Sequence, residues 1–291
     1  MTDAKRKIYF LPIFILVLLV ADSYLLYLDW RGFHNQGLTF AMLDIGQGDA
    51  LFIESPSGTQ VLVDAGPPRK ILGGLKRVMS PFDKSIDALI MTNPDQDHIG
   101  GFSDVLEVYQ VGSFFEPGTI NDSKTFQNLK YEIKNKEIPD ILAKRGMRLN
   151  LGGGAVIDIL FPDRDVFDWA SNDGSIVAKL TYGDTSVMLT GDATVNTEKI
   201  ILGEYSPEAL QSTILKVGHH GSHTSTSEEF VKVVTPEYAL ISNGRNNKYG
   251  HPHQETLDTL GSFGTQIFRT DILGTIIMQS DGKNVSFPSQ K

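Results

Sequence analysis

Apolar residues along most of this chain occur in short runs, and each run is closed by glycine, proline, aspartate or asparagine. Runs of this length are typical of strands buried in a sheet, and the residues between them are typical of tight turns. From residue 38 onward we therefore expect a globular α/β domain. The predicted strands are 38–43, 50–54, 60–63, 86–92, 111–115, 155–161, 176–182, 186–189, 213–217 and 238–242; the predicted helices are 71–79, 103–109 and 254–260, with one or two surface helices within 122–148.

The first 30 residues follow a different pattern. Lys5-Arg6-Lys7 precede an apolar stretch from 8 to 28, which reaches about the 20 residues that a membrane-spanning helix needs. Basic residues ahead of such a span place the N-terminus in the cytoplasm and the rest of the chain outside. We therefore expect residues 1–30 to be a cytoplasmic stub with a single membrane anchor, 31–37 to be a polar linker, and 38–291 to form an extracytoplasmic domain.

A cleaved signal peptide is the main alternative for this segment; a buried soluble helix is a third, which the basic residues ahead of the stretch disfavour. Ala21-Asp22-Ser23 resembles the small residues of a cleavage site, and cleavage there would leave a secreted domain. The apolar stretch continues past Ser23, however, and this extra length favours the uncleaved anchor.

Composition narrows the range of functions only slightly. The 291 residues suffice for one large domain with a real core and a short appendage. The formal charge of -9 argues against a protein that grips nucleic acid by bulk electrostatics, although local basic patches remain compatible with it. The chain has no cysteine, which excludes disulfides and thiolate metal sites.

The loop after the predicted strand 86–92 is the richest in chemistry. Asp95, Asp97 and His98 lie within four positions, and a Gly-Gly pair follows. Carboxylates and an imidazole crowded in this way repel or desolvate one another unless a cation lies between them. Oxygen ligands with one imidazole suit Mn²⁺, Zn²⁺ or Mg²⁺. The loop therefore predicts a metal site, and an acidic surface turn is the alternative.

Two later strand ends carry similar groups. Asp192 follows Thr-Gly after the strand 186–189, where a carboxylate can bridge two metals, or simply form a turn. His219 and His220 follow the strand 213–217 at a glycine-flanked turn. Adjacent histidines point in different directions, so we expect one to bind metal and the other to face substrate. Which one does which stays open at this point.

Polar residues near these loops are candidates for substrate binding. The loop 243–253 is rich in donors that could hold a phosphate or another polar substrate, although it could also be an ordinary loop before the helix 254–260. We expect substrate contacts from His223, Asn247, Lys248 and His251. Asp64, which ends the strand 60–63, could orient the metal loop or form a turn.

Taken together, these motifs resemble the metallo-β-lactamase superfamily, and within it the extracellular domain of ComEC-type competence proteins. The resemblance spans about 38–287, and its motifs occur in the same order as in that family. They are LDIGQGDA at 43–50, LVDAG at 62–66, the run 95–101, NDGS at 172–175, LTGD at 189–192, HHGS at 219–222, YGHPH at 249–253 and RTD at 269–271.

The resemblance implies a four-layer αββα sandwich of two mixed sheets flanked by helices, with metals between the sheet ends. It also implies the ligands. Asp97, His98, Asp192 and one member of the His219/His220 pair would hold one metal. Asp95 would help hold a second metal, with Asp192 bridging the two.

Two departures from the family pattern affect the second metal. Asn93 stands where the family motif carries a histidine ligand, and no histidine lies between His98 and His219, so the central histidine is missing too. An Asn carboxamide is a neutral, weak oxygen donor that suits Mn²⁺ or Mg²⁺ better than Zn²⁺. We expect one complete metal site beside a weakened one in which Asn93 is a ligand.

The resulting functional hypothesis is a membrane-anchored, extracytoplasmic, metal-dependent hydrolase, specifically a phosphodiesterase or DNA nuclease of the competence type. Its catalytic residues would be Asp95, Asp97, His219 and His220, with one or two divalent ions (Mn²⁺ or Zn²⁺, or Mg²⁺). We expect DNA or another phosphodiester as substrate and a separate channel or competence protein as partner.

Two alternatives remain beside this hypothesis. The acidic charge favours an envelope hydrolase of another phosphoester, an ester or a lactam. Asn93 and the missing histidine favour a degenerate module that binds nucleic acid or a protein without turnover.

Overall fold

The computed structural model describes residues 3–34 and 37–288, and the chain divides between residues 36 and 37 into two units. The N-terminal unit is one helix, α1 (Asp3–His34), whose described side chains, 12–27, are all exposed. Over the described residues, no helix combines the length and apolar character needed to cross a membrane. The predicted anchor also includes the side chains of 1–11 and 28–30, which lie outside those described; residues 31–34 of the predicted linker continue the helix.

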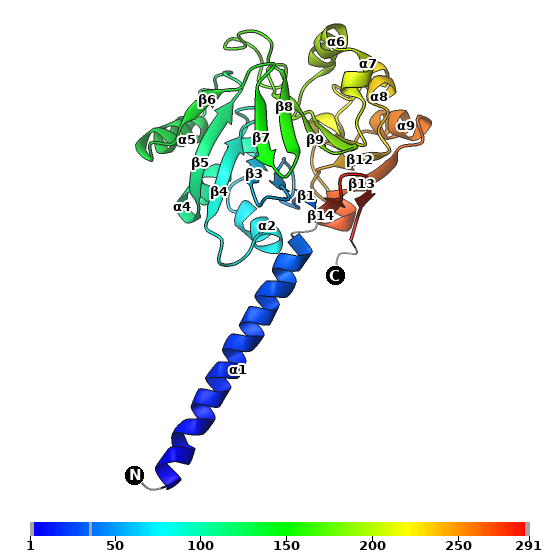
Figure 1. The fold of residues 1–291 in the computed structure, drawn as a ribbon. Coiled ribbons are helices and arrows are strands. Elements are labelled where there is room, and N and C mark those ends of the chain that lie inside the picture. The colour runs from blue at the N-terminus through cyan, green and yellow to red at the C-terminus, as the bar shows by residue number, and fades with distance from the viewer. Residues whose placement is uncertain (1–2, 35–36, 289–291) are drawn as a thin grey trace. The chain divides into compact units, whose positions relative to one another are not determined.

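The C-terminal unit is built on two sheets that pack face to face (Figure 1). The first has eight strands in the order β15-β14-β1-β2-β3-β4-β5-β6. These are β1 (Leu38–Met42), β2 (Leu51–Glu54), β3 (Gln60–Val63), β4 (Ser85–Ile90), β5 (Gln110–Glu116), β6 (Asp140–Leu142), β14 (Ile276–Ser280) and β15 (Val285–Ser286).

The second sheet has seven strands in the order β13-β12-β11-β10-β9-β8-β7. These are β7 (Arg148–Gly152), β8 (Ala155–Phe161), β9 (Val177–Tyr182), β10 (Thr185–Leu189), β11 (Ile214–Lys216), β12 (Tyr238–Ile241) and β13 (Gln266–Arg269). The described helices of this unit are α2 (Ile71–Val78), α3 (Gln96–Ile99), α4 (Phe102–Val108), α5 (Lys124–Asn135), α6 (Val195–Glu204), α7 (Pro207–Leu210), α8 (Glu228–Val234), α9 (Gln254–Ser262) and α10 (Thr270–Leu273).

Side chains alternate between the two faces of each strand, and this alternation divides the core into layers. Phe40 of β1 faces the second sheet and packs in one cluster with Leu180 and Leu240. Phe52 of β2 points the other way, into a cluster that includes residues of α2, α4 and α5. The outer face of the second sheet packs against α6 and α8 through residues such as Phe230. The predicted mixed α/β sandwich with two sheets and outer helices is therefore confirmed.

The direction of the strands explains where polar groups gather. In the first sheet β3, β4 and β5 run parallel, and in the second β10, β11, β12 and β13 do. Parallel neighbours end at the same edge of a sheet, so the loops after these strands share that edge. Strands β3 and β4 precede Asp64 and the 91–98 loop, while β10 and β11 precede Asp192 and the two adjacent histidines.

The segment 122–148 agrees with its prediction only in part. It forms one helix, α5, and its second half becomes the strand β6 and the first residue of β7 instead of another helix. The reason lies in tertiary pairing, because β6 adds to the sheet edge alongside β5 with Phe115 opposite Ile141. Local sequence does not show such an edge, since the partner strand β5 lies outside the segment and helix α5 separates the two strands along the chain.

Candidate metal centre

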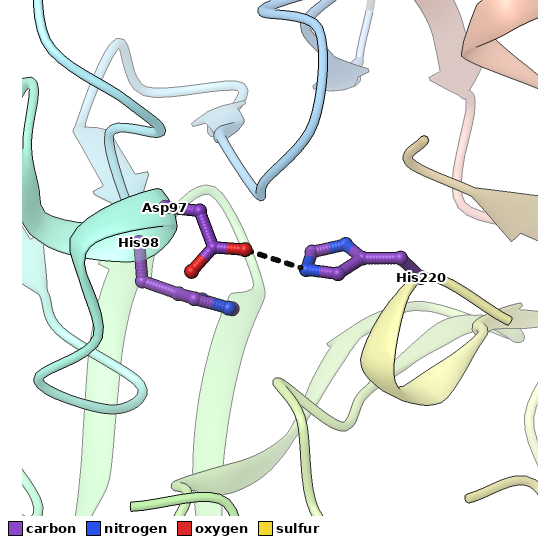
Figure 2. Close-up of side chains that lie close together, drawn as sticks. All are labelled: Asp97, His98 and His220. Atoms are coloured by element: carbon purple, nitrogen blue, oxygen red, sulfur yellow. Dashed lines mark ion pairs between the residues drawn. The ribbon is translucent and has the colours of Figure 1, made fainter. Parts of the chain in front are cut away.

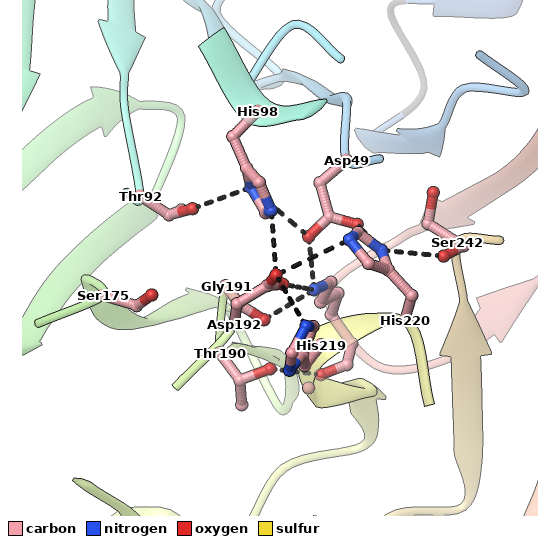
Figure 3. A network of polar contacts seen from close by, with 12 residues as sticks. Asp49, Thr92, His98, Ser175, Thr190, Gly191, Asp192, His219, His220 and Ser242 are labelled. Carbon is pink, nitrogen blue, oxygen red and sulfur yellow. Dashed lines mark hydrogen bonds and ion pairs between the residues drawn. The ribbon is translucent and has the colours of Figure 1, made fainter. Parts of the chain in front are cut away.

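Six ionisable side chains from both sheets meet in the C-terminal unit at the edge where the parallel strands end. Figure 3 shows most of this network, with Asp49, His98, Asp192 and His220 pointing toward a common centre. Asp64 and Lys216 complete it. The side chains of all six are at least 96% buried, since their exposed fractions run from 0% to 4%. Groups of this kind stay buried only when they are paired or bind a cation.

Asp64 orients the first histidine. It follows β3 in a left-handed conformation (φ 58°), which non-glycine residues seldom adopt. Its carboxylate accepts hydrogen bonds from the Thr92 backbone N–H (2.8 Å), from the Thr92 hydroxyl (2.5 Å) and from Nδ1 of His98 (2.8 Å). The hydrogen bond to Nδ1 leaves the lone pair of the imidazole on Nε2. Asp64 therefore has the orienting role that was one of its two predicted roles.

The second histidine is held by strained backbone. His219 and His220 have positive φ angles of 46° and 55° inside a tight turn, Gly218–Gly221. Two successive non-glycine residues in this region are costly and typical of functional sites. Nδ1 of His220 lies 3.0 Å from the backbone O of Ser242, to which it donates a hydrogen bond, and this leaves Nε2 as the nitrogen that could bind a metal.

The two Nε2 atoms converge on carboxylate oxygens. His98 Nε2 lies 3.1 Å from Asp192 Oδ2, and His220 Nε2 lies 3.4 Å from Asp97 Oδ2 and 3.6 Å from Asp192 Oδ2. Figure 2 shows Asp97 and His98, which follow β4, facing His220 across the centre. Donors bound side by side to one ion at about 2.1 Å lie about 3.0–3.4 Å apart, so these separations fit ligands of a common cation.

The unused hydrogen-bonding capacity of these atoms supports the same reading. Nε2 of His98 and Nε2 of His220 are buried without a hydrogen-bond partner. A lone pair that faces a carboxylate is unfavourable unless a positive charge lies between them. Two imidazoles and two carboxylates form a donor set suited to Mn²⁺, Zn²⁺ or Mg²⁺. The residues present therefore fit a divalent metal.

Electrostatics at the centre also favour a positive charge. Burial would lower the pKa of His98, but Asp192 and Asp64 outweigh it and raise this pKa well above its usual range. Burial likewise opposes the charged form of His220, yet Asp192 and Asp49 raise its pKa to about 10. Burial would raise the pKa of Asp97, but hydrogen bonding to His220 and the charge of His98 lower it to about 2. A metal ion at the centre satisfies the same carboxylates without those protons.

Asp49 and Lys216 belong to the network although sequence reasoning missed them as site residues. Asp49 lies in the loop between β1 and β2, pairs with Nζ of Lys216, and has Oδ1 3.3 Å from Nδ1 of His220. The loop fits only because residue 48 is glycine, since a Cβ there would lie 2.1 Å from the backbone O of Asp97. A lysine inside the apolar run of β11 was the signal that could have revealed the pair.

The structure separates the two adjacent histidines. His220 belongs to the converging set, whereas His219 lies beside it, with Nε2 3.7 Å from Asp192 Oδ2 and its side chain 25% exposed. Nδ1 of His219 lies 3.0 Å from the Thr224 hydroxyl. His219 thus borders the centre on its accessible side, and His220 is the member of the pair that could hold the ion.

Asn93 and Asp95, both predicted metal ligands, lie differently. Oδ1 of Asn93 accepts a hydrogen bond from the backbone N–H of Asp95 (2.9 Å), and its Nδ2 lies 3.5 Å from the Ser175 hydroxyl. Asp95 accepts a hydrogen bond from Asn121 (3.3 Å). Among the described residues, the tight groups of potential ligands are Asp97-His98-His220, Asp49-Asp192-His220 and Asp49-Asp64-His98, and Asp95 is in none of them. Asn93 thus supports the loop, and its use as a ligand stays a prediction.

Of the residues predicted to bind substrate, His251 lies near the metal centre and His223 lies further out at the surface. The His251 ring lies 5.6 Å from that of His219, and burial together with the nearby His220 lowers the pKa of His251 to about 4. His223 is exposed and pairs with His253 through their Nδ1 atoms (2.8 Å). These imidazoles extend from the metal centre toward the surface.

Asn247 has a task other than the predicted one. Its Nδ2 donates to the backbone O of Gly244 (3.0 Å) and of His251 (2.6 Å), while its Oδ1 accepts from the N–H groups of Tyr249 and His251. The amide is therefore fully used in shaping the loop that carries His251. Lys248 is exposed beside it, with Nζ 5.0 Å from the centre of the Tyr249 ring.

Comparison with known proteins adds a family and a fold. The sequence profile of the metallo-beta-lactamase superfamily matches residues 43–245. "ComE operon protein 3" of Bacillus subtilis is 35% identical over 262 residues, which cover 81% of this chain and 32% of that protein. "Recombination protein 2" of Haemophilus influenzae is 29% identical over 238 residues, which cover 80% of this chain and 28% of that protein. The chain spans less than a third of the length of these relatives.

Solved structures share the fold at low sequence identity. A metallo hydrolase from the archaeon Ignicoccus hospitalis superposes with a TM-score of 0.55 at 17% identity, over 83% of this chain and 99% of that one. CmlA, a diiron β-hydroxylase from Streptomyces venezuelae, superposes with a TM-score of 0.54 at 13% identity, over 84% of this chain and 54% of that one. The two differ in chemistry, so the likeness speaks for the fold alone.

Proposed function

This chain belongs to the metallo-β-lactamase superfamily, and from that premise we propose that it is a metal-dependent hydrolase of phosphodiesters, a nuclease of the competence type. The observation that carries the proposal is the convergence of two unpartnered Nε2 atoms, those of His98 and His220, on the carboxylates of Asp97 and Asp192. Relatives described as competence and recombination proteins support a nucleic-acid substrate.

Each ligand would have a defined part in this activity. His98, His220, Asp97 and Asp192 would hold the ion, with Asp64 fixing the orientation of His98. When bound, a divalent ion activates water at neutral pH and polarises a phosphoryl oxygen. Asp97 is the most exposed of the four ligands, at 37%, and so places the ion toward solvent and substrate.

The imidazoles beside the centre would bind the substrate. Burial lowers the pKa of His219, and His251 has a pKa of about 4, so both rings are neutral at pH 7 and offer an N–H donor to a phosphate oxygen. Lys248 is exposed on the same loop as His251 and would add a positive charge for a phosphate on one side of the scissile bond. His223, close to His253, would lie further along the substrate.

The N-terminal unit and the relatives support a proposal for the location and the partners. We propose that residues 8–28 anchor the chain in a membrane with residues 38–291 on the extracytoplasmic side. The exposed apolar side chains of α1, from Ile13 to Leu26, support this arrangement. A separate channel or competence protein would then receive or deliver the DNA strand.

The test is a nuclease assay with Mn²⁺, Zn²⁺ or Mg²⁺ on single- and double-stranded DNA. Asp97→Asn should lower the cleavage rate at least about 100-fold, since it weakens binding of the ion and removes a negative charge beside it. Asp168→Asn, an exposed carboxylate outside the centre, should cleave at the wild-type rate. Equal rates for wild type and Asp97→Asn would refute the proposal.

The same assay, together with a titration of metal binding, distinguishes the two histidines. His220→Ala should lose both metal binding and cleavage, whereas His219→Ala should keep the ion and raise KM for DNA. Loss of metal binding in His219→Ala with retention in His220→Ala would reverse the assignment.

One observation favours a second candidate function. The carboxamide of Asn93 is hydrogen-bonded to Asp95 and Ser175 rather than free, as in a site that no longer holds a second ion. Such a protein would bind DNA without cleaving it. DNA binding by wild type with no metal-dependent turnover on any DNA, phosphoester, ester or lactam substrate would favour this candidate.

A further inference from the structure

Lys216 is the one fully buried lysine in the part of the chain that the structure describes, and its ammonium lies among the acids of the metal centre. Its Nζ pairs with Asp49 Oδ2, donates to the backbone O of Gly191 (2.6 Å) and lies 3.7 Å from Asp192 Oδ1. The opposite oxygen of Asp192, Oδ2, is the one that faces His98 and His220. Asp192 thus has a lysine on one oxygen and the candidate metal ligands on the other.

The position of this ammonium matters because the acids offer more than one place for a cation. Among the described residues, Asp97-His98-His220 and two further groups that include Asp49 have donor atoms within 4.8 Å of one another. One of these further groups is Asp49-Asp192-His220. Lys216 pairs with Asp49 and approaches Asp192, so its ammonium already supplies a positive charge to that group.

We propose that Lys216 is a fixed internal cation that takes the place of a second metal ion, so that this centre binds a single divalent ion. The ion would lie between Asp97, His98, His220 and Oδ2 of Asp192. The inference rests on the proposed metal centre, but it does not depend on the substrate or on turnover.

The charges of the buried groups agree with one ion. With both histidines neutral as ligands, the buried carboxylates of Asp49, Asp64 and Asp192 contribute three negative charges, and Lys216 contributes one positive charge. One divalent ion brings this buried total to zero, and a second would make it plus two in a region where uncompensated charge is costly. The side chain of Asp97 is 37% exposed, so solvent screens its charge. Asn93 and Ser175, whose side chains contact each other, offer only neutral oxygens to another ion.

Lys216 is therefore a positioning residue rather than a catalytic one. Its ammonium pairs with Oδ2 of Asp49 and places a positive charge 3.7 Å from Oδ1 of Asp192, so Oδ2 of Asp192 is the oxygen left for the metal. Oδ1 of Asp49, in turn, faces Nδ1 of His220 at 3.3 Å and helps aim that ring. Replacing the ammonium by a neutral group would release two carboxylate oxygens in one place.

The test counts bound ions and uses no activity. Full-length wild type, Lys216→Met and Lys179→Met are saturated with Mn²⁺, and bound ions are counted by native mass spectrometry and by the Mn²⁺ electron paramagnetic resonance spectrum. Lys179 is the matched control, because its Nζ also donates to backbone carbonyls, in this case those of Ala209 and Gln211, but lies outside the centre. We expect one ion in wild type and Lys179→Met, and two spin-coupled ions in Lys216→Met.

Two results would overturn the inference. One is a wild type that binds two ions, and the other is a folded Lys216→Met that binds one ion with an unchanged spectrum. If Lys216→Met does not fold, the double variant Asp49→Asn/Lys216→Met removes both charges of the pair and should fold with one ion. Two ions in that double variant would also overturn the inference. A protein that cleaves nothing but binds one ion would refute the proposed activity and leave this inference standing.

Discussion

Replacing Asp64 by asparagine tests how the first histidine is prepared for the metal. In wild type the carboxylate accepts three hydrogen bonds, two from Thr92 and one from Nδ1 of His98. An asparagine of the same shape can keep an acceptor for Thr92, but its NH₂ group then faces His98. The imidazole must turn its Nδ1 lone pair toward that donor, which moves its proton to Nε2, the atom needed by the ion.

The expected size of the effect follows from those contacts. Loss of an outer partner of a metal-binding histidine typically costs about 10- to 100-fold in affinity, or about 1.4–2.7 kcal/mol. Because Asp64→Asn also inverts the tautomer of His98, we expect a loss of at least about 100-fold, at the upper end of that range. Thr92→Val removes one partner of the carboxylate and leaves the contact to His98, so it should cost less than about 10-fold.

Isothermal titration with Mn²⁺ or Zn²⁺ on folded protein measures both variants, with circular dichroism as the check on folding. If Asp64→Asn bound the ion within about twofold of wild type, the assignment of His98 Nε2 as the metal-binding atom would be refuted, since the tautomer would then be irrelevant. A loss in Thr92→Val as large as in Asp64→Asn would show that loop geometry rather than the proton controls affinity.

Three further outcomes are expected. Gly48→Ala should abolish metal binding, measured by titration, because its Cβ would lie 2.1 Å from the backbone O of Asp97. Gly58→Ala, with open space around its Cβ, should only lower the free energy of unfolding by about 1–2 kcal/mol, measured by urea unfolding. Burial and the nearby Asp83 raise the pKa of Glu54 from 4.5 to about 7. Between these pH values the folded state holds a proton that the unfolded state has lost, so the free energy of unfolding should fall by about 1–2 kcal/mol from pH 4.5 to pH 7. Glu54→Gln should remove this part of the pH dependence in urea titrations, and an unchanged dependence would contradict the assignment. Chelation of an ion present at about 100 times its Kd should lower stability by about 2.7 kcal/mol in a thermal scan, and an unaltered Tm would argue against a bound ion.

Much of the fold could be predicted from local sequence because apolar runs mark buried strands regardless of their partners. The run 60–63 is an example, since β3 has the same bounds. Strand β14 was missed as a partner of β1, although Phe40 pairs with Met278, because residues so far apart in the sequence leave no local sign of their pairing. Likewise β6 exists only because β5 offers it an edge.

The site was predictable where one loop carried several ligands and obscure where single residues came from far apart. The loop with Asp97 and His98 was predictable because several ionisable residues lie close together in its sequence. The choice between His219 and His220 needed the left-handed backbone of both residues, which no spacing rule supplies. Asp49 and Lys216 were not predicted as site residues because neither lies near other ionisable site residues in the sequence, and only the fold brings them together.

The ligands of the proposed ion come equally from the two sheets: Asp97 and His98 follow β4 of the first, while Asp192 and His220 follow β10 and β11 of the second. A cation held by all four would link the two sheets at the edge where their parallel strands end. Neither half of the chain could then be exchanged, truncated or expressed by itself without losing the ion. When the ion is bound, backbone amide hydrogen exchange should slow in the strands that end near it, while the amides of the helices on the outer faces exchange at unchanged rates.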